Sequence, residues 1–238
     1  MGKNIHVSVV IPAFNEEAYI EPTLKALQNQ NYPKENYEIV VVDNNSTDNT
    51  ASIALKVGAK VVREEKQGYV FTLNKGVFSA TNEVIAVTDA DTKVSDDWVK
   101  KIAQAFEDEK LAALTGEIRP ETSSKFRTKF LAFLYNLFLS FNFSIGKPHL
   151  TGPNLAFRKS FFKQIGGLDI RFEMSPDVDL GLRLKKYGKV ILRKDIWVLT
   201  STRRWEKGRI KAFWKYGVGY FNTVWFRRPP KVDLEVYR

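Results

Sequence analysis

The sequence predicts an α/β protein with a Rossmann-like, mostly parallel central sheet flanked by helices. Short apolar runs alternate with helical patterns through the first part of the chain, which is typical of βαβ units. The run Val84-Ile85-Ala86-Val87 lacks polar alternation and predicts a strand covered on both faces. The chain has 238 residues, 44% of them hydrophobic, and is therefore long enough to bury one sizeable core.

The apolar runs predict four strands, at Val7–Ile11, Tyr37–Val42, Lys60–Val62 and Val84–Thr88. After the first strand, Ile20, Leu24 and Leu27 recur at helical spacing. Pro22 is tolerated only in the first turn of a helix, so this helix begins near Glu21.

Two further helices are expected downstream. Gly68 opens one of them, and its small size permits close approach of a ligand or another backbone. Ser95 is expected to cap the other, with Asp96 and Asp97 in a first turn where the helix dipole favours anions. The apolar face of that helix consists of Trp98, Ile102, Ala105 and Phe106.

The segment from Phe130 to Phe143 is almost entirely apolar. Spanning a bilayer takes about 20 residues in a helix, so this segment is too short to cross one. Two interpretations stay open: a buried helix, or a helix at a membrane interface or along a binding groove.

Composition narrows the function classes. The chain has no cysteine, which excludes disulfide scaffolds, thiolate nucleophiles and zinc-cysteine sites. Residues 1–6 lack the basic-then-apolar pattern of a secretory signal, so we expect a reducing cytoplasmic location.

Positive charge is concentrated near the end of the chain. The formal net charge is +10, and residues 203–231 contain nine Lys or Arg against one acid. Aromatic residues interleave with these basic ones, a combination that favours an anionic membrane surface and also occurs in nucleic-acid binding. We expect residues 206–238 to form a basic aromatic, membrane-interfacial helical extension of a domain over residues 1–205.

Acidic and polar residues follow three of the predicted strands. Asp89 and Asp91 come after the buried strand, Asp43 ends the second, and Pro12 to Glu17 follow the first. Open α/β sheets bind ligands at the carboxyl ends of their strands. Carboxylates two residues apart on an extended segment point the same way and suit Mg²⁺ or Mn²⁺ shared with a diphosphate. The alternative for Asp89 and Asp91 is a solvated turn. Asp43 to Asp48 also suit an Asx turn in which Asp48 or Ser46 caps the next helix, a role that does not exclude ligand binding.

In combination these motifs resemble the family 2 glycosyltransferases over roughly residues 6–205. The resemblance rests on Val-Ile-Pro-Ala-Phe-Asn-Glu-Glu (10–17), Val-Val-Asp-Asn-Asn-Ser-Thr-Asp (41–48), Asp-Ala-Asp (89–91), Gly-Gly-Leu-Asp (166–169) and Pro-Asp-Val-Asp-Leu-Gly-Leu-Arg (176–183). It implies a GT-A fold, a divalent cation and inversion at the anomeric carbon. The donor it implies is a nucleotide-diphosphate sugar, and both UDP-sugars and GDP-sugars stay open.

The same resemblance implies roles for individual positions. Pro12, Ala13, Glu16 and Asp43 line the base and ribose, and Gly68 lies near the nucleotide. Asp89 contacts the ribose or the sugar, and Asp91, with Asp89, holds the metal. Asp177 matches the general base, although Pro176 replaces the glutamate that precedes it in the family.

Asp177 has a structural alternative as well. It could be the capping acid of a helix running toward Tyr187, in whose exposed first turn we place Asp179. Thr151-Gly152-Pro153-Asn154 precedes a further expected strand and resembles the family's loop on the acceptor side.

Ser201 to Trp205 resembles the Gln-x-x-Arg-Trp motif of processive synthases. The resemblance implies that Arg204 contacts the diphosphate and Trp205 stacks on a sugar. Serine stands in place of the glutamine, which argues against processive polymerisation.

The expected partners follow from these features. A base at Asp177 favours a hydroxyl acceptor, whereas a polyprenyl-phosphate sugar synthase, whose acceptor is already an anion, needs none. We expect a lipid or lipid-linked acceptor, peripheral contact with the inner face of the cell membrane, and no nucleic acid. The alternatives are a nucleic-acid-binding module, a nucleotidyltransferase and a sheet that binds nucleotide sugars without turnover.

Overall fold

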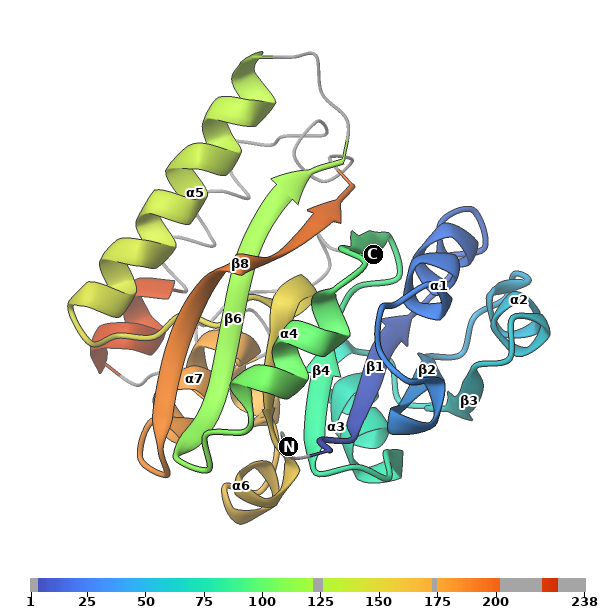
Figure 1. Cartoon of the computed structure of the whole chain (residues 1–238), viewed down its shortest axis with the longest axis horizontal. Coiled ribbons are helices and arrows are strands. Elements are labelled where there is room, and N and C mark those ends of the chain that lie inside the picture. The colour runs from blue at the N-terminus through green and yellow to red at the C-terminus, as the bar shows by residue number, and fades with distance from the viewer. Residues whose placement is uncertain (1–3, 122–125, 173–174, 202–219, 227–238) are drawn as a thin grey trace.

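The computed structural model describes residues 4–121, 126–172, 175–201 and 220–226. They form an α/β protein around one eight-stranded sheet with the order β3-β2-β1-β4-β7-β6-β8-β5 (Figure 1). The strands are β1 (Val7–Ala13), β2 (Tyr37–Asp43), β3 (Lys60–Arg63), β4 (Val84–Val87), β5 (Thr92–Val94), β6 (Leu111–Pro120), β7 (Leu155–Arg158) and β8 (Lys189–Thr200). We call residues 4–91 the first half and the described residues from 92 onward the second half.

Seven α-helices are described, together with four short helical turns. The α-helices are α1 (Ile20–Gln28), α2 (Thr50–Lys56), α3 (Tyr69–Ser79), α4 (Trp98–Ala105), α5 (Phe126–Ser144), α6 (Lys159–Gln164) and α7 (Pro176–Leu184). The short turns are η1 (Lys34–Asn36), η2 (Gly152–Asn154), η3 (Ile170–Phe172) and the π-helical η4 (Asn222–Phe226).

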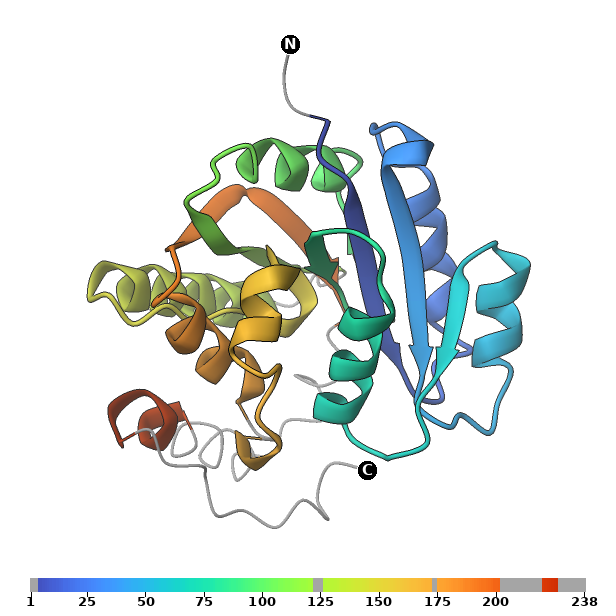
Figure 2. The ribbon, with the colours of Figure 1, turned by 90° about the horizontal axis from the view of Figure 1, so that it is seen from below.

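Helices lie on both faces of the sheet (Figure 2), and an apolar layer holds them to each face. Helices α1, α2 and α4 cover one face, where Leu24 and Trp98 are fully buried against the Val9 side of β1. Helices α3, α6 and α7 cover the other face around Val10 and Phe162. Adjacent residues of β1 therefore face different layers, as the period of two in a strand requires.

The four strands expected in the first half are confirmed, with ends shifted by at most two residues. β1, β2, β3 and β4 pair in parallel, and every residue of β4 is buried, as its unbroken apolar run indicated. β5 and β7 run antiparallel to their neighbours, so the sheet is mixed beyond β4.

The expected start of α4 is wrong in detail. The helix begins at Trp98, so Asp96 and Asp97 precede it, and the Ser95 hydroxyl donates to Asp97 Oδ1 (3.0 Å) without capping the helix. The side chain of Gln30 takes that role, since its Oε1 accepts the Val99 N–H at 2.9 Å.

The apolar segment from Phe130 to Phe143 lies in α5, and the interpretation as a buried helix is wrong. One side of α5 packs on the sheet through Ala132 and Leu139, but the other side leaves Phe133 63% and Phe141 59% exposed. No helix within the described ranges is both long and apolar enough to cross a bilayer.

Candidate active site

The loops after β1, β2 and β4 leave the sheet at one shared edge. Ala13 pairs with Asp43, so β1 and β2 end level, whereas β4 ends at Val87 opposite Val10, three residues earlier along β1. The Thr88 N–H donates to the Val10 carbonyl at 3.3 Å, so the chain after β4 continues along β1 toward the same edge. β7 runs the opposite way and its first residue, Leu155, pairs with Val87, so η2 reaches the same edge. Neighbouring strands lie about 4.8 Å apart, so the axes of β2 and β4, which flank β1, lie about 10 Å from each other.

The loops after β1 and β2 are tied to each other by side-chain hydrogen bonds. Asn15 adopts a positive φ of 53° and its Oδ1 accepts the Thr47 N–H at 2.9 Å. In return, Ser46 Oγ accepts the Asn15 N–H at 3.0 Å, and Asp48 Oδ2 accepts the Glu17 N–H at 3.1 Å. Asp48 also accepts the N–H of Thr50, the first residue of α2, which confirms the expected Asx turn.

The four residues that the resemblance assigns to base and ribose lie in and just after these strand ends. Pro12 and Ala13 are the last two residues of β1, and the carbonyl of Ala13 accepts the Asn44 N–H at 2.8 Å. Asp43 ends β2 with its side chain mostly buried. Glu16 is half-buried, and its N–H donates to Thr50 Oγ1 at 2.8 Å.

Gly68 is held in place by Asn44, a residue that the sequence analysis did not single out. Asn44 Nδ2 donates to the carbonyls of Glu64 and Lys66 (2.9 and 2.7 Å), and its Oδ1 accepts the Gly68 N–H at 2.9 Å. Gly68 has φ +131°, which a residue with a Cβ rarely adopts. The Asn44-Asn45 pair directly after a strand was the available signal, because asparagine readily bonds to nearby backbone.

Asp89 and Asp91 occupy the tight connection between β4 and β5. The carbonyl of Asp89 accepts the Thr92 N–H at 3.2 Å, and that of Asp91 accepts the Ser201 N–H at 3.2 Å. Asp91 is buried and Asp89 is half-buried. The connection is therefore anchored to the end of β8, which brings the second half of the chain to the Asp-Ala-Asp segment.

In the second half, Asn154 fixes η2 beside this connection. Its Oδ1 accepts the indole N–H of Trp98 at 2.9 Å, and its Nδ2 donates to the carbonyls of Glu117 and Ile196 at 3.0 and 3.1 Å. Asn154 is fully buried, and its amide oxygen and nitrogen both have hydrogen-bond partners, as buried polar groups require. The position of η2 is thereby set from α4, β6 and β8 together.

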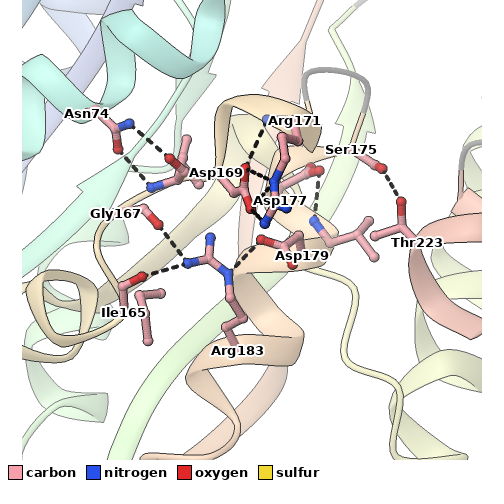
Figure 3. Close-up of polar contacts among 12 residues, drawn as sticks. Asn74, Ile165, Gly167, Asp169, Arg171, Ser175, Asp177, Asp179, Arg183 and Thr223 are labelled. Carbon is pink, nitrogen blue, oxygen red and sulfur yellow. Dashed lines mark hydrogen bonds and ion pairs between the residues drawn. The ribbon is translucent and has the colours of Figure 1, made fainter. Parts of the chain in front are cut away.

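Asp177 lies in the first turn of α7 and faces η2. Its Oδ2 accepts the Gly152 N–H at 3.1 Å. Its Oδ1 accepts the Val178 N–H at 3.0 Å (Figure 3). Burial raises the pKa of Asp177 to about 6, and the negative charge of Asp89 adds to the rise. Asp89 and Asp177, which are 88 positions apart in the sequence, therefore lie close enough to interact across the site.

Gly152 also joins the two halves. A Cβ at Gly152 would lie 3.2 Å from the hydroxyl of Tyr69, the residue after Gly68. The start of α3 in the first half therefore packs against the loop that bonds to Asp177. The structure brings Gly68, Asp89, Asp91 and Asp177 to one region, while Asp43 lies two strands away along the same edge.

The helix that carries Asp177 is fixed by a buried ion pair (Figure 3). Arg183 Nε donates to Asp179 at 2.6 Å, and Arg183 Nη1 donates to the carbonyls of Ile165 and Gly167 at 3.0 and 2.8 Å. Asp179 is 3% exposed, so its expected place in an exposed first turn is wrong. The reason is Arg183, one helical turn later, which neutralises Asp179 as it becomes buried.

Asn74 links α3 to the same region. Its Oδ1 accepts the Leu168 N–H at 2.8 Å, and its Nδ2 donates to the Leu168 carbonyl at 3.1 Å. Gly167 has φ +79°, and a Cβ there would lie 2.7 Å from Asn74 Oδ1. The small residues of the Gly-Gly-Leu segment thus allow the two halves to approach closely. The sequence did not indicate that Asn74 and Arg183 hold this segment in place.

Arg204 and Trp205, expected at the diphosphate and the sugar, lie outside the described residues, as does most of the expected extension 206–238. Residues 220–226 of that extension are described, and Ser175, the residue before α7, bonds to Thr223 through their hydroxyl groups at 2.8 Å.

A cavity of about 810 Å³ opens elsewhere, beside the amino ends of β6 and β8. Lys110, Lys185 and Lys189 contribute to its lining, but Lys185 donates to the Gly146 carbonyl and Lys189 pairs with Asp108. Because the cavity is at the sheet edge opposite the carboxylates, it does not belong to the site around Asp177.

The chain matches known proteins over most of its length. The family model described as Glycosyl transferase family 2 matches residues 8–166. The enzyme dolichyl N-acetyl-alpha-D-glucosaminyl phosphate 3-beta-D-2,3-diacetamido-2,3-dideoxy-beta-D-glucuronosyltransferase of Methanococcus voltae is 28% identical over 246 residues, covering 92% of this chain and 76% of that protein. The probable glycosyltransferase YdaM of Bacillus subtilis (strain 168) is 32% identical over 202 residues, covering 76% of this chain and 47% of that protein.

Among solved structures, the mannosyltransferase PcManGT from Pyrobaculum calidifontis, in complex with GDP-Man and Mn²⁺, has a similar fold. The TM-score is 0.70 at 21% identity, over 93% of this chain and 63% of that one. This likeness confirms the GT-A fold that the sequence predicts. The chain spans about half the length of the Bacillus relative and under two thirds of the mannosyltransferase.

Proposed function

Because this chain belongs to glycosyl transferase family 2 and is a glycosyltransferase, we propose that it moves a sugar from a UDP- or GDP-linked donor to a hydroxyl group, with inversion at the anomeric carbon. The observation that carries the proposal is the setting of Asp177. It is a carboxyl group with a raised pKa at the start of a helix, oriented by the Gly152 N–H and within range of the Asp89 charge. Such a group is suited to accept a proton near neutral pH.

In this proposal the first half binds the donor. Pro12, Ala13, Glu16 and Asp43 line the base and ribose, and Gly68 allows close approach of the nucleotide. Their places at one sheet edge support this assignment, since open α/β sheets bind ligands there.

Asp91, helped by Asp89, would hold a Mg²⁺ or Mn²⁺ ion. Mg²⁺ is usually bound through one or two carboxylates together with substrate phosphates. The described residues contain no group of three or more acids or histidines able to hold a metal on their own, which fits a site completed by the donor's diphosphate. When bound, the ion supplies Lewis-acid neutralisation of the charge on the departing diphosphate.

Asp177 acts as the base in this scheme. An acceptor hydroxyl attacks the anomeric carbon on the face opposite the diphosphate, the bond to the diphosphate breaks, and the hydroxyl proton passes to the Asp177 carboxylate. Two backbone N–H groups already orient the two carboxylate oxygens, so little reorganisation is needed. With a pKa of about 6, the group is largely ionised at pH 7 and is still basic enough to take the proton.

We extend the proposal to a lipid or lipid-linked acceptor at the inner face of the cell membrane. The Methanococcus voltae relative, whose name contains a dolichyl sugar phosphate, supports this extension. The basic aromatic composition of residues 203–231 also supports it, because Lys and Arg near an anionic leaflet each contribute about 1 kcal/mol of attraction. A polyprenyl-phosphate acceptor remains the second candidate, and it is disfavoured by a base at Asp177.

A two-step experiment tests the proposal. A thermal-shift panel of UDP-, GDP- and dTDP-sugars with and without Mn²⁺ identifies the donor, because a ligand that binds the folded state raises the melting temperature. The matching donor is then incubated with lipid-linked saccharides and with polyprenyl phosphate. Nucleoside diphosphate release that depends on the saccharide acceptor supports the proposal. Release of sugar 1-phosphate, or turnover with polyprenyl phosphate alone, contradicts it.

A further inference from the structure

The outer side of α5 carries a continuous row of exposed apolar side chains. Phe126, Phe130, Leu137 and Phe141 recur at helical spacing and are 81%, 48%, 55% and 59% exposed. Neighbouring positions widen the row, namely Phe133, Leu134, Phe138 and Ile145. Contiguous apolar surface of this kind marks interaction sites, whereas single exposed apolar residues are ordinary.

The orientation of α5 is fixed by polar contacts on its inner side. Asn136 Nδ2 donates to the Ile118 carbonyl at 2.8 Å, and Asn136 Oδ1 accepts the Ile118 N–H at 3.2 Å. This two-way hydrogen bond joins the middle of α5 to β6 and prevents rotation about the helix axis. The row of apolar side chains therefore faces outward in the folded chain, as Figure 1 shows for the position of α5 at the edge of the molecule.

The exposed apolar surface continues onto η4. The rings of Phe138 and Tyr220 lie 5.0 Å apart, and the Tyr220 hydroxyl donates to Asn142 Oδ1. Beyond this contact Trp225 is 56% exposed, and Lys147 Nζ lies 5.3 Å from the centroid of its ring. We call this combined surface the aromatic face; it consists of the exposed apolar residues of α5 and Ile145 together with Phe221, Trp225 and Phe226.

The charge of the surrounding sequence indicates which partner fits. Residues 122–157, which include α5 and the loop after it, contain four Lys or Arg and no acid. A second copy of this chain would bring two such basic stretches together without neutralising them. An anionic lipid surface offers hydrocarbon for the apolar side chains and negative headgroups for lysines such as Lys129 and Lys147.

The aromatic face is connected directly to the helix that carries Asp177. Val224 packs with Val178 and Leu182 of α7, and Thr223 bonds to Ser175. On the inner side of α5, burial raises the pKa of Tyr135 and the Asp177 charge adds to the rise, so the two residues are near each other. A surface bound to the aromatic face would therefore lie next to the acceptor side of the site.

We propose that the aromatic face is the membrane-docking surface of this chain, with α5 lying in the plane of an anionic lipid interface and presenting the acceptor side of the site to it. This inference rests on the proposed function and deepens it by naming the surface that meets the lipid. It differs from attachment through the basic residues 203–231, because apolar burial is not screened by salt.

Vesicle flotation tests the assignment with a matched pair of variants. Phe133→Ser with Leu137→Ser removes two side chains of the aromatic face that are 63% and 55% exposed. Phe78→Ser with Leu55→Ser removes the same residue types, 51% and 60% exposed, elsewhere on the molecule. We expect the original chain and the control to float with phosphatidylcholine–phosphatidylglycerol vesicles at high salt, and the α5 variant to partition roughly tenfold more weakly.

Three outcomes would overturn the inference. They are equal binding of both variants, absence of binding by the original chain, and a dimer in light scattering that dissociates only in the α5 variant. Nucleoside diphosphate release measured without vesicles keeps this result separate from the proposed function. Donor turnover without flotation rejects the docking surface alone, and flotation without any donor turnover rejects the transferase function alone.

Discussion

The two halves of the chain build their parts of the site in different ways. In the first half, hydrogen bonds between the loops that follow two adjacent parallel strands, such as Asn15 with Thr47, set the positions of the groups assigned to the donor. In the second half, Asp177 is placed by several elements that are not neighbouring strand ends, because η2 depends on Trp98 of α4 and α7 depends on contacts with residues 165–167 after α6.

Because of this difference, donor binding and proton transfer can be tested by mutations in different halves of the chain. The first half offers side chains at an open edge, whereas the second half offers one carboxyl group whose pKa is raised by burial. Donor binding and proton transfer should therefore respond to different substitutions, even though Asp89 and Asp177 interact across the boundary.

Asp177→Asn gives the largest expected effect. Without a base, the transfer rate should fall about 100- to 10,000-fold, while donor affinity stays within about threefold of the original. Transfer assays and calorimetric titration of the donor measure the two quantities. Asp195→Asn, which removes a surface partner of Arg193, serves as the control. Full transfer activity in Asp177→Asn would refute the role of base and with it the division between the halves.

Asp91→Asn should affect the first half of the chain, which is assigned to the donor and the cation. Removing a carboxylate assigned to the cation is expected to lower cation-dependent donor turnover by about 100- to 1,000-fold, the scale of losing one electrostatic stabiliser of a transition state. Nucleoside diphosphate release measured across a Mn²⁺ titration checks it. Asp96→Asn, an exposed acid in the following loop, should leave the titration unchanged. An unchanged Mn²⁺ response in Asp91→Asn would contradict the metal assignment.

Arg183→Leu tests whether the second half depends on its buried ion pair. The substitution removes the Arg183 charge and its hydrogen bond from the buried Asp179 carboxylate, which costs about 3 kcal/mol of unfolding free energy. For a chain of this size the melting temperature should fall by roughly 6 to 12 °C. Arg171→Leu removes an ion pair with Asp169 in which the arginine side chain is 72% exposed, and it should lower the melting temperature much less. Equal effects of the two substitutions would show that burial of the pair does not matter.

The sequence predicted the first half better than the second. Strands β1 to β4 were readable because each is a short apolar run followed by a polar loop, and the Asp-Ala-Asp segment follows a fully buried strand. Of the strands in the second half, only β7 was anticipated. β6 and β8 are long and their polar residues do not alternate regularly, since their burial varies along their length.

The site residues that sequence reasoning missed act through distant partners. Asn74 bonds to Leu168 and Asn154 bonds to Trp98, and neither spacing forms a local pattern. Asp179 was misplaced for a related reason. A carboxylate in a helix's first turn is ordinarily solvated, and only the folded position of Arg183 accounts for its burial. Local chemistry predicts groups that contact ligands, whereas the groups that position them depend on the fold.

The smallest expected effect concerns the interaction between the Asp89 and Asp177 charges, which crosses between the halves. Asp177 must be ionised to act as base, so kcat/KM should rise with pH through about 6 and level off once the group is ionised. Asp89→Asn removes a negative charge that raises this pKa, so the rising limb should move to lower pH. Burial is the larger cause of the raised pKa, so the movement should stay below roughly one pH unit. The pH profile at saturating donor measures it, with Asp195→Asn as control, and a limb that stays in place or moves to higher pH would mean that Asp89 and Asp177 do not interact in the working enzyme.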